Sequence, residues 1–296
     1  MVNIREKKTG KQTYYYLEHS MREGSKIIKK EKYLGKEIPK EIDKIKRAFV
    51  IESYKEKWFN DFEKIKNNYS KEQKIMPPSS KAKQKQTFAV KFTYNTQKIE
   101  GSSLSLKDTS NLIEKGITPS EKPISDVIEA EEHNKVFYEM LSYEKELSLQ
   151  IVLYWHKKLF EKTKPDVAGK VRNHQVGISL SKYTPPMPSE LDFLIKDFFD
   201  WYNKSKNKLN PVELAALVHL KWVTIHPFGD GNGRISRLMM NFVLHKNGYP
   251  MLDIPYTKRN SYYTSLERSQ VKKDDSPFLN WFFKRYIKNC EGYSKS

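Results

Sequence analysis

The sequence predicts a mainly α-helical protein with one or two small β-hairpins. Apolar residues recur at three- and four-residue steps over several long stretches, which is typical of amphipathic helices. Residues 12–34 and 168–186 instead show short strand patterns around turn residues. The chain of 296 residues is long enough for one large domain or two modest ones.

The N-terminal region is predicted to begin with a β-hairpin. Residues 12–19 and 26–34 are expected to form its two strands, and the turn between them contains Gly24. A single hairpin is only marginally stable alone, so this one should pack against another element. That element is a helix from residue 41 to about residue 74, in which large apolar residues recur at helical spacing: Ile45, Phe49, Tyr54, Trp58, Phe62 and Ile65.

A domain boundary is predicted near residue 80. Pro77-Pro78-Ser79-Ser80 interrupts the helical pattern, and the lysine-rich residues 81–85 follow. Residues 1–80 would then form a basic hairpin and helix region, and residues 81–296 would form the second domain.

The net charge of +18 is concentrated towards the N-terminus, because residues 1–85 hold 23 Lys/Arg and 12 Asp/Glu. This asymmetry favours a polyanionic or acidic partner, although a well-solvated lysine-rich surface would have the same composition. Basic residues and tyrosines interleave in residues 1–80, which suits nucleic acid, but no recognised nucleic-acid motif is present.

The composition also narrows the class of protein. The single cysteine, Cys290, excludes an internal disulfide and offers no metal cluster. No apolar run approaches the length of a membrane span, and no charged-then-apolar leader follows Met1. A cytoplasmic protein without a membrane segment is therefore expected.

The second domain is predicted to be a series of helices interrupted by one hairpin. Within residues 168–186 the apolar residues alternate at Val176, Ile178 and Leu180, and the segment ends at Pro185-Pro186, which favours a β-hairpin. The segment before residue 226 is apolar on nearly all faces, so it should be a buried helix. The helices are expected at residues 87–100, 105–116, 125–142, 148–162, 189–202, 211–225, 232–246 and 277–288.

Residues 226–237 carry the chemistry. Glycines at 231 and 233 permit a backbone whose N–H groups converge on an anion, and a helix starting near Asn232 adds unpaired N–H groups and its dipole. Arg234 and Arg237 lie on one face of that helix. Asp230 offers a hard oxygen of the kind Mg²⁺ prefers, and His226 can move a proton near neutral pH. A glycine-rich turn between core helices could carry the same residues without chemistry.

This stretch resembles the signature of the Fic family, His-Pro-Phe-x-(Asp/Glu)-Gly-Asn-Gly-Arg-x-x-Arg, at every fixed position. Residues 168–172 (Ala-Gly-x-x-Arg) and 260–266 also resemble family segments, so the likeness covers roughly residues 87–290. The resemblance implies a Fic-type helical bundle with a β-hairpin flap. It also implies an enzyme that moves AMP from Mg-ATP onto a Ser, Thr or Tyr hydroxyl of a target protein.

The resemblance assigns a role to each motif residue. His226 would be the general base, Asp230 the Mg²⁺ ligand, and Phe228 the residue that anchors the loop in the core. Gly231, Asn232 and Gly233 would hold the α- and β-phosphates, Arg234 the β-phosphate and Arg237 the γ-phosphate. Asn260 and Tyr263 would border the adenine, although a core tyrosine is an equally good interpretation of Tyr263.

A second family motif predicts self-inhibition. Thr96-Gln97-Lys98-Ile99-Glu100-Gly101 matches the (Ser/Thr)-x-x-x-Glu-(Gly/Asn) pattern of the class whose inhibitory helix, here about residues 87–101, precedes the Fic core. Glu100 could pair with Arg237 and occupy the place of the γ-phosphate, because an Arg–carboxylate pair excludes a second anion. A helix-end glutamate that faces water is the alternative.

Other interpretations stay open at this point. Residues 170–186 could hold an extended target segment as an added strand, or could be an ordinary surface hairpin. A hydrolase that removes AMP from a modified protein, with Glu100 positioning water, fits the same residues. So does a nucleotide-sensing regulator that binds nucleic acid through residues 1–80. Many relatives are dimers, which is compatible with a homodimer here.

Overall fold

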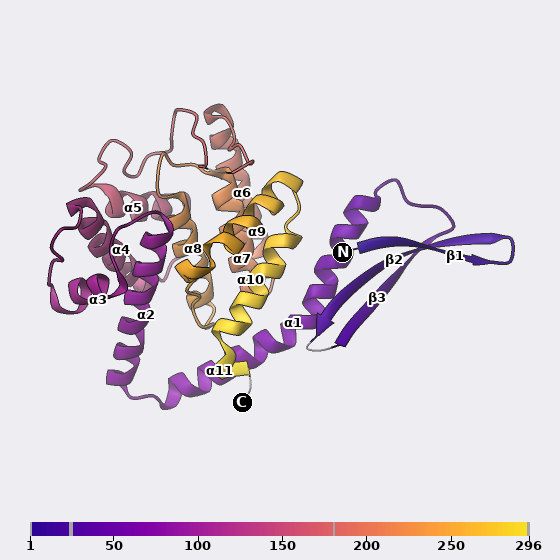
Figure 1. Ribbon diagram of the computed structural model, residues 1–296, viewed down its shortest axis with the longest axis horizontal. Coiled ribbons are helices and arrows are strands. Elements are labelled where there is room, and N and C mark those ends of the chain that lie inside the picture. Colours follow the sequence, from indigo (N-terminus) through magenta and orange to yellow (C-terminus); the bar gives the residue numbers. More distant parts are fainter. Residues whose placement is uncertain (1, 24–25, 180, 295–296) are drawn as a thin grey trace. The chain divides into compact units, whose positions relative to one another are not determined.

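The computed structural model describes residues 2–23, 26–179 and 181–294 (Figure 1). The chain forms two compact units, Met1–Asp61 and Phe62–Ser296. The protein is mainly helical, as the sequence predicts. Its elements are β1 (Val2–Thr9), β2 (Gln12–Glu23), β3 (Lys26–Gly35), α1 (Ile42–Ile75), α2 (Pro78–Ile99), α3 (Leu106–Lys115), α4 (Ile124–Ser142), α5 (Leu149–Phe160), α6 (Leu191–Ser205), α7 (Pro211–Ile225), α8 (Asn232–Lys246), α9 (Arg259–Lys272), α10 (Ser276–Asn289) and α11 (Glu291–Ser294), with short 3-10 turns at Pro188–Glu190 and Tyr256–Lys258.

The first unit contains a three-stranded antiparallel sheet, not the two-stranded hairpin predicted, because β1 pairs along the whole of its length with β2. One face of β2 is buried through Leu17 and Met21. From the same face the ring of His19 lies 5.9 Å from the ring of Tyr54 on α1. The sheet therefore packs against the first part of α1, as a marginal β-unit requires.

The two units divide within α1, between Asp61 and Phe62, and not near residue 80. The reason is packing: Phe62 is completely buried, and its ring lies 5.1 Å from Phe283 and 5.8 Å from Tyr286 of α10. The second part of α1 thus belongs to the core of the second unit. The predicted break at Pro77 is real, but it separates only α1 from α2.

Helix α2 begins at Pro78, nine residues before the predicted start at Thr87. Proline is tolerated in the first turn of a helix because its missing N–H would have no intrahelical partner there. The lysine-rich residues 81–85 form the next turns of the same helix, and Lys83 and Lys85 are exposed.

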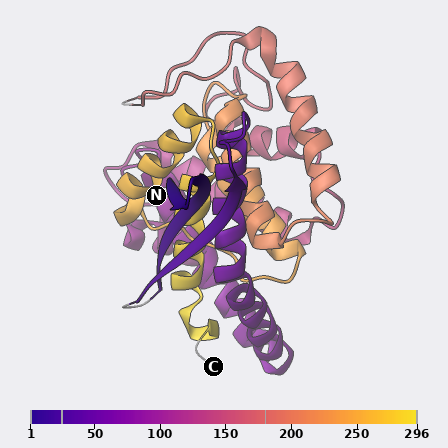
Figure 2. The ribbon, with the colours of Figure 1, turned by 90° about the vertical axis from the view of Figure 1, so that its right-hand side faces the viewer.

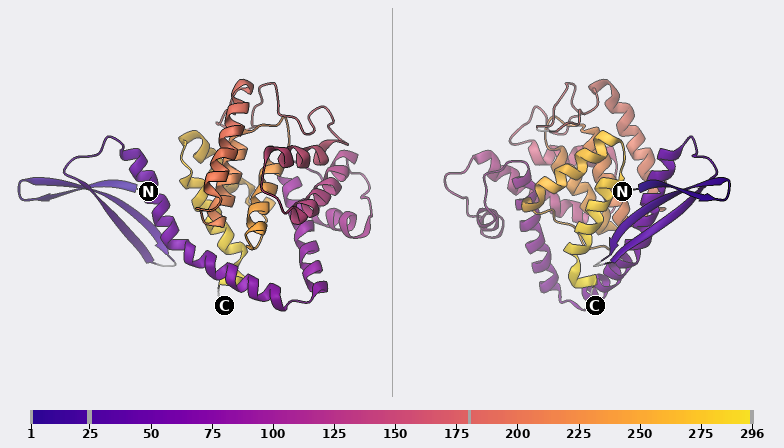
Figure 3. Two further views of the ribbon diagram at one scale, coloured as in Figure 1. Left: turned by 180° about the vertical axis from the view of Figure 1, so that it is seen from behind. Right: turned by 45° about the vertical axis from the view of Figure 1, so that its right-hand side comes forward.

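Helices α7 and α8 form the centre of the second unit (Figure 3). Helix α7 is buried on nearly every face, as its apolar sequence predicts. Helices α6 and α10 pack against α7, whereas α2, α4 and α5 pack against α8. This arrangement holds the 226–231 connection between two buried helices.

The predicted hairpin at residues 168–186 is wrong for the described part of that segment, which contains no strand. Side chains take the place of a β-ladder there. Arg172 donates through Nη1 to the carbonyl of His174 and through Nη2 to that of Pro186, at 2.8 and 2.6 Å. Gln175 donates to the carbonyl of Pro185 at 2.9 Å. These three carbonyls accept from side chains and not from a partner strand, and residues 168–179 and 181–186 run as a loop (Figure 2).

No helix in the described ranges is both long enough and apolar enough to span a membrane.

Candidate active site

The loop that connects α7 to α8 turns sharply at two residues with positive φ. His226 ends α7 with φ 53° and ψ 55°, and its backbone N–H donates to the carbonyl of Trp222 at 3.0 Å. Gly231 precedes α8 with φ 80°. A left-handed conformation is unusual for a histidine and is retained only where the surroundings impose it. The turn holds the imidazole at the edge of the loop that leads into α8.

Phe228 anchors this loop. Its side chain is completely buried, and its ring stacks on that of His156 with centroids 3.8 Å apart. The amide of Asn232 accepts from the N–H of Phe228 at 2.9 Å and donates to its carbonyl at 2.8 Å. The side chain of Asn232 therefore braces the loop with its oxygen and one of its two amide N–H groups, and its role towards a phosphate stays a prediction.

His156 is a structural histidine with a defined tautomer. Its Nδ1 accepts from the N–H of Gly169 at 2.8 Å, so its Nε2 carries the proton and donates to the carbonyl of Asp230 at 3.0 Å. Burial lowers the pKa of His156 to about 4. The ring is therefore neutral and links α5 to the motif loop.

His226 has the tautomer that a general base requires. Its Nδ1 lies 3.1 Å from the carbonyl of Val223, which can only accept, so Nδ1 carries the proton and Nε2 bears the free lone pair. Burial lowers the pKa of His226 below its ordinary value, more than the carbonyl contact raises it. The imidazole is therefore neutral, and able to take a proton, at pH 7.

Asp230 is charged and shared between two cations. Its Oδ2 accepts from Lys164 Nζ at 2.7 Å, and its Oδ1 accepts from Arg234 Nη2 at 3.0 Å. Burial would raise the pKa of Asp230, but Arg234 and Lys164 outweigh it and lower the pKa to about 2. Lys164 also lies 2.9 Å from Glu129.

The donor set around Asp230 fits a metal that arrives with a phosphate. Within the described ranges, no group of three His, Cys, Asp or Glu side chains could hold a metal ion. Mg²⁺ commonly takes one or two protein carboxylates and completes its shell with water and substrate phosphates. One ionised carboxylate beside a helix N-terminus suits that mode of binding, but it is too few ligands to hold a metal ion without a substrate.

Neither motif glycine has room for a side chain. A Cβ at Gly231 would lie 2.3 Å from the ring of Phe160, and one at Gly233 would lie 2.2 Å from Glu100 Oε1. Helix α8 begins without a side-chain cap. Its first backbone N–H groups therefore have no capping side chain, and a helix start of this kind can hold an anion; the phosphate roles of Gly231, Asn232 and Gly233 stay predictions.

Arg234 lies in a buried ion-pair network rather than in an open site. Its guanidinium bonds to Glu129 on α4, donates to Gln97 on α2 at 3.1 Å, and contacts Asp230. The guanidinium carbon Cζ of Arg234 lies 4.5 Å from the ring centroid of Phe160. These contacts hold three elements together, so a role on the β-phosphate requires the network to share the guanidinium.

Arg237 is paired with Glu100, as the resemblance to the inhibitory motif predicts. Its Nη2 lies 2.6 Å from Glu100 Oε1 and 3.1 Å from the carbonyl of Thr96, whose hydroxyl accepts from Nε. Its Nη1 lies 3.3 Å from the hydroxyl of Tyr262. Burial would lower the pKa of Arg237, but the Glu100 carboxylate outweighs it and raises the pKa. Arg237 is 1% exposed, so its charge is satisfied inside the protein.

Tyr263 and Asn260, the two residues predicted to border the adenine, differ in their surroundings. Tyr263 donates to the carbonyl of Ile99 at 3.0 Å, and therefore contacts the end of α2 that carries Glu100. Its side chain is 45% exposed, which leaves one side of the ring open. Asn260 is exposed at the start of α9. Neither residue is a core residue, and their nucleotide roles stay predictions.

Arg172 is a site residue that the sequence analysis did not single out. Besides its contacts to the loop at residues 174–186, its Nε donates to the carbonyl of His226 at 2.9 Å, and its backbone N–H donates to that of Pro227 at 2.9 Å. Its side chain is buried. Arg172 thus ties the backbone of the motif histidine to the segment predicted as the flap. The Ala-Gly-x-x-Arg run was the available signal.

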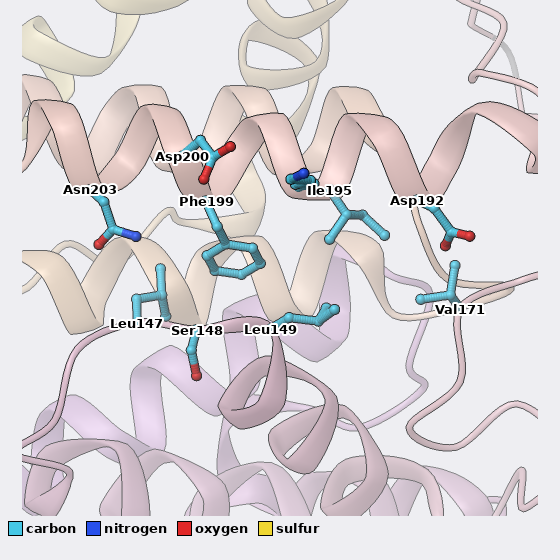
Figure 4. A pocket seen from close by; sticks show the side chains of 10 residues that line it. Leu147, Ser148, Leu149, Val171, Asp192, Ile195, Phe199, Asp200 and Asn203 are labelled. Atoms are coloured by element: carbon cyan, nitrogen blue, oxygen red, sulfur yellow. The ribbon is translucent and has the colours of Figure 1, made fainter.

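A cavity of about 370 Å³ lies between α6 and the connection from α4 to α5 (Figure 4). Its apolar lining includes Leu147, Val171 and Phe199, and Asp192 and Asp200 lie at its edge. None of the side chains of residues 226–237 lines it, so this cavity is separate from the motif site.

Comparison with known proteins agrees with this site. Residues 146–244 match the Fic/DOC family. The chain is 33% identical to protein adenylyltransferase fic-1 of Caenorhabditis briggsae over 214 residues, which cover 68% of this chain and 40% of the relative. It is 33% identical to protein adenylyltransferase Fic of Drosophila willistoni over 207 residues, 67% of this chain and 39% of the relative. The match thus spans about 40% of these relatives' length.

Two solved structures have the same fold. A Fic domain containing signaling protein from Bacteroides thetaiotaomicron is 27% identical with a TM-score of 0.71, over 79% of this chain and 96% of that one. Fic-1 from Caenorhabditis elegans is 26% identical with a TM-score of 0.68, over 82% of this chain and 72% of that one.

Proposed function

This chain contains a Fic/DOC family domain, and from that premise we propose that it is a self-inhibited protein adenylyltransferase. The observation that carries the proposal is the neutral imidazole of His226 in the loop that leads into α8, a helix that begins without a side-chain cap. The carboxylate of Glu100 lies against Gly233 in the first turn of that helix. A general base next to an anion site suits transfer of a nucleotide to a hydroxyl. The carboxylate at this helix start suits inhibition within the same chain.

The proposed reaction is one in-line displacement. Nε2 of His226 takes the proton from a Ser, Thr or Tyr hydroxyl of the target as its oxygen attacks the α-phosphorus of ATP. The new P–O bond forms as the bond to pyrophosphate breaks, and pyrophosphate leaves. The imidazolium then returns its proton to solvent. Because Nδ1 is held by the carbonyl of Val223, the lone pair keeps one direction throughout.

The N–H groups at the start of α8 would stabilise the charge on the phosphates, and Asp230 would hold Mg²⁺. When bound, Mg²⁺ supplies a positive charge that neutralises the leaving pyrophosphate. Asp230 is suited to this role because its low pKa keeps it ionised. Lys164 now occupies one of its oxygens, so the lysine must turn away or share the carboxylate with the metal.

Self-inhibition would act through Arg237. In the proposed active state its guanidinium binds the γ-phosphate, but in this structure it is held by Glu100. A γ-phosphate would meet the carboxylate there as a like charge. ATP that binds without this contact is expected to turn its α-phosphate away from His226.

The target protein would bind to residues 170–186. The loop formed by the described residues of this segment, 170–179 and 181–186, and its link through Arg172 to the carbonyl of His226 support the proposal, because a target held there is coupled to the base. The transfer chemistry gives no role to nucleic acid, so a nucleic-acid partner depends on the N-terminal region alone.

Hydrolysis of an AMP-modified protein is the second candidate. The Glu100 side chain retains 27% of its exposure while its Oε1 binds Arg237, so its other oxygen could orient a water molecule. In that reaction Glu100→Gly would abolish AMP release, whereas in the transfer reaction it would increase AMP incorporation. Wild type and Glu100→Gly incubated with Mg-ATP, and separately with an AMP-modified protein, distinguish the two activities.

A further inference from the structure

The sheet of the first unit has a two-stranded extension. Strands β1 and β2 remain paired as far as Thr9 and Gln12, whereas β3 joins β2 only from the pair Tyr15–Gly35 onwards. Residues 7–14 therefore form an antiparallel ribbon with no third strand beside it, and Figure 1 shows the β1–β2 hairpin reaching beyond the end of β3.

This ribbon is basic and free of acidic residues. Residues 7–17 contain three lysines and no Asp or Glu. Lys7, Lys8 and Lys11 are exposed, and within the described ranges no carboxylate lies within ion-pair distance of them. By contrast, Arg5 and Lys29 on the body of the sheet are paired with Glu18. Within the described ranges, the ribbon thus has three exposed lysines without an ion-pair partner, whereas Arg5 and Lys29 on the body of the sheet are each paired with a carboxylate.

Aromatic side chains form the base of the ribbon. The ring of Tyr33 on β3 lies 5.2 Å from that of Tyr16 and 6.3 Å from that of Tyr14, on one face of the sheet. Tyr33 is 53% exposed. Such contacts between β2 and β3 stabilise the sheet at the point where the two-stranded ribbon leaves it.

We propose that the β1–β2 ribbon binds duplex DNA, with the hairpin in the major groove and Lys7, Lys8 and Lys11 on the phosphates. The major groove of B-form DNA admits a two-stranded ribbon, whereas the major groove of A-form RNA is too narrow for one. Exposed lysines next to a polar tip (Thr9, Gln12, Thr13) give phosphate contacts with hydrogen-bonding groups between them. The proposal is independent of the transfer reaction.

The test is fluorescence anisotropy of a labelled, mixed-sequence DNA duplex titrated with the full chain at several salt concentrations. The variant is Lys7→Glu, Lys8→Glu and Lys11→Glu combined. Because each phosphate contact contributes about 0.9 to the slope of log K against log salt, loss of all three should reduce that slope by roughly 3. The triple Gln variant, which adds no negative charge, should lose affinity in the same direction but less.

A charge-matched control addresses the overall basicity of the chain. Lys81→Glu, Lys83→Glu and Lys85→Glu combined remove the same charge from a lysine run on α2, and this variant should keep most of the DNA affinity and the wild-type salt slope. An equal loss in both variants would overturn the proposal, and so would unchanged binding in the two ribbon variants. Equal affinity for duplex RNA or for a polyglutamate peptide would reject DNA as the partner. Circular dichroism confirms that each variant is folded.

Discussion

Removal of the Glu100 carboxylate should activate the protein. Glu100 Oε1 lies 2.6 Å from Nη2 of a fully buried Arg237, so the γ-phosphate must displace a charge-assisted hydrogen bond before it can bind there. Such a bond contributes about 1.5–3 kcal/mol. Taking about 2 kcal/mol, and one factor of ten for each 1.4 kcal/mol, Glu100→Gly should increase AMP incorporation roughly 30-fold.

The assay is incorporation of radiolabelled AMP at matched protein concentration. Glu100→Gln is the matched control, because its amide oxygen can still accept from Arg237 but carries no charge, so its activity should lie between wild type and Glu100→Gly. The double variant Glu100→Gly with Arg237→Ala should lose much of the gain. ADP, which has no γ-phosphate, should bind wild type and Glu100→Gly about equally. If Glu100→Gly is no more active than wild type on itself or on a cell extract, the inhibitory role is wrong.

Three further predictions concern the base, the metal and the loop. His226→Ala should lower the transfer rate roughly 10²–10⁴-fold and leave the ATP affinity measured by calorimetry nearly unchanged. Because burial lowers the pKa of His226 and the neutral form is active, the wild-type rate should fall on the acid side only below pH 6.5. A fall that begins above that pH would contradict the assignment of His226 as the base. Asp230→Asn should cost about 10²–10³-fold in rate, and equal activity in EDTA and in Mg²⁺ would remove the metal role. Arg172→Lys should lower kcat on a protein target roughly tenfold through the loss of one or two hydrogen bonds. Arg172→Gln should lower kcat further, and both variants should keep the ATP affinity of the wild type. A wild-type kcat in both variants would show that Arg172 positions nothing.

The local sequence predicted the elements that bury an apolar face. Helix α7 has apolar residues on nearly all sides, and it is buried as expected. Strand β1 escaped prediction because its side chains are mostly exposed and it is stabilised by backbone pairing with β2. A strand without a buried face leaves no alternating pattern in the sequence.

The segment at residues 168–186 shows the opposite error. Val176 and Ile178 are apolar residues two positions apart, a spacing that indicated a strand. The backbone carbonyls there accept instead from the side chains of Arg172 and Gln175, contacts between side chain and backbone that periodicity does not report.

Within the site, the ion pair between Glu100 and Arg237 was predictable because each residue lies in a segment that resembles a motif of the Fic family. The network around Arg234 was not. Glu129 and Lys164 come from α4 and from the loop after α5, and only the packing of those elements on α8 brings their charges to Asp230 and Arg234. A lone lysine or glutamate carries no signal of such a contact.

The most direct test of the proposed function is mass spectrometry of the purified protein after incubation with Mg-ATP. Glu100→Gly, alone or with a cell extract, should acquire an AMP adduct on a Ser, Thr or Tyr side chain, and the adduct should vanish when His226→Ala is added to the same variant. The absence of any AMP adduct in Glu100→Gly, or its persistence without His226, would contradict a self-inhibited transferase that uses His226 as its base.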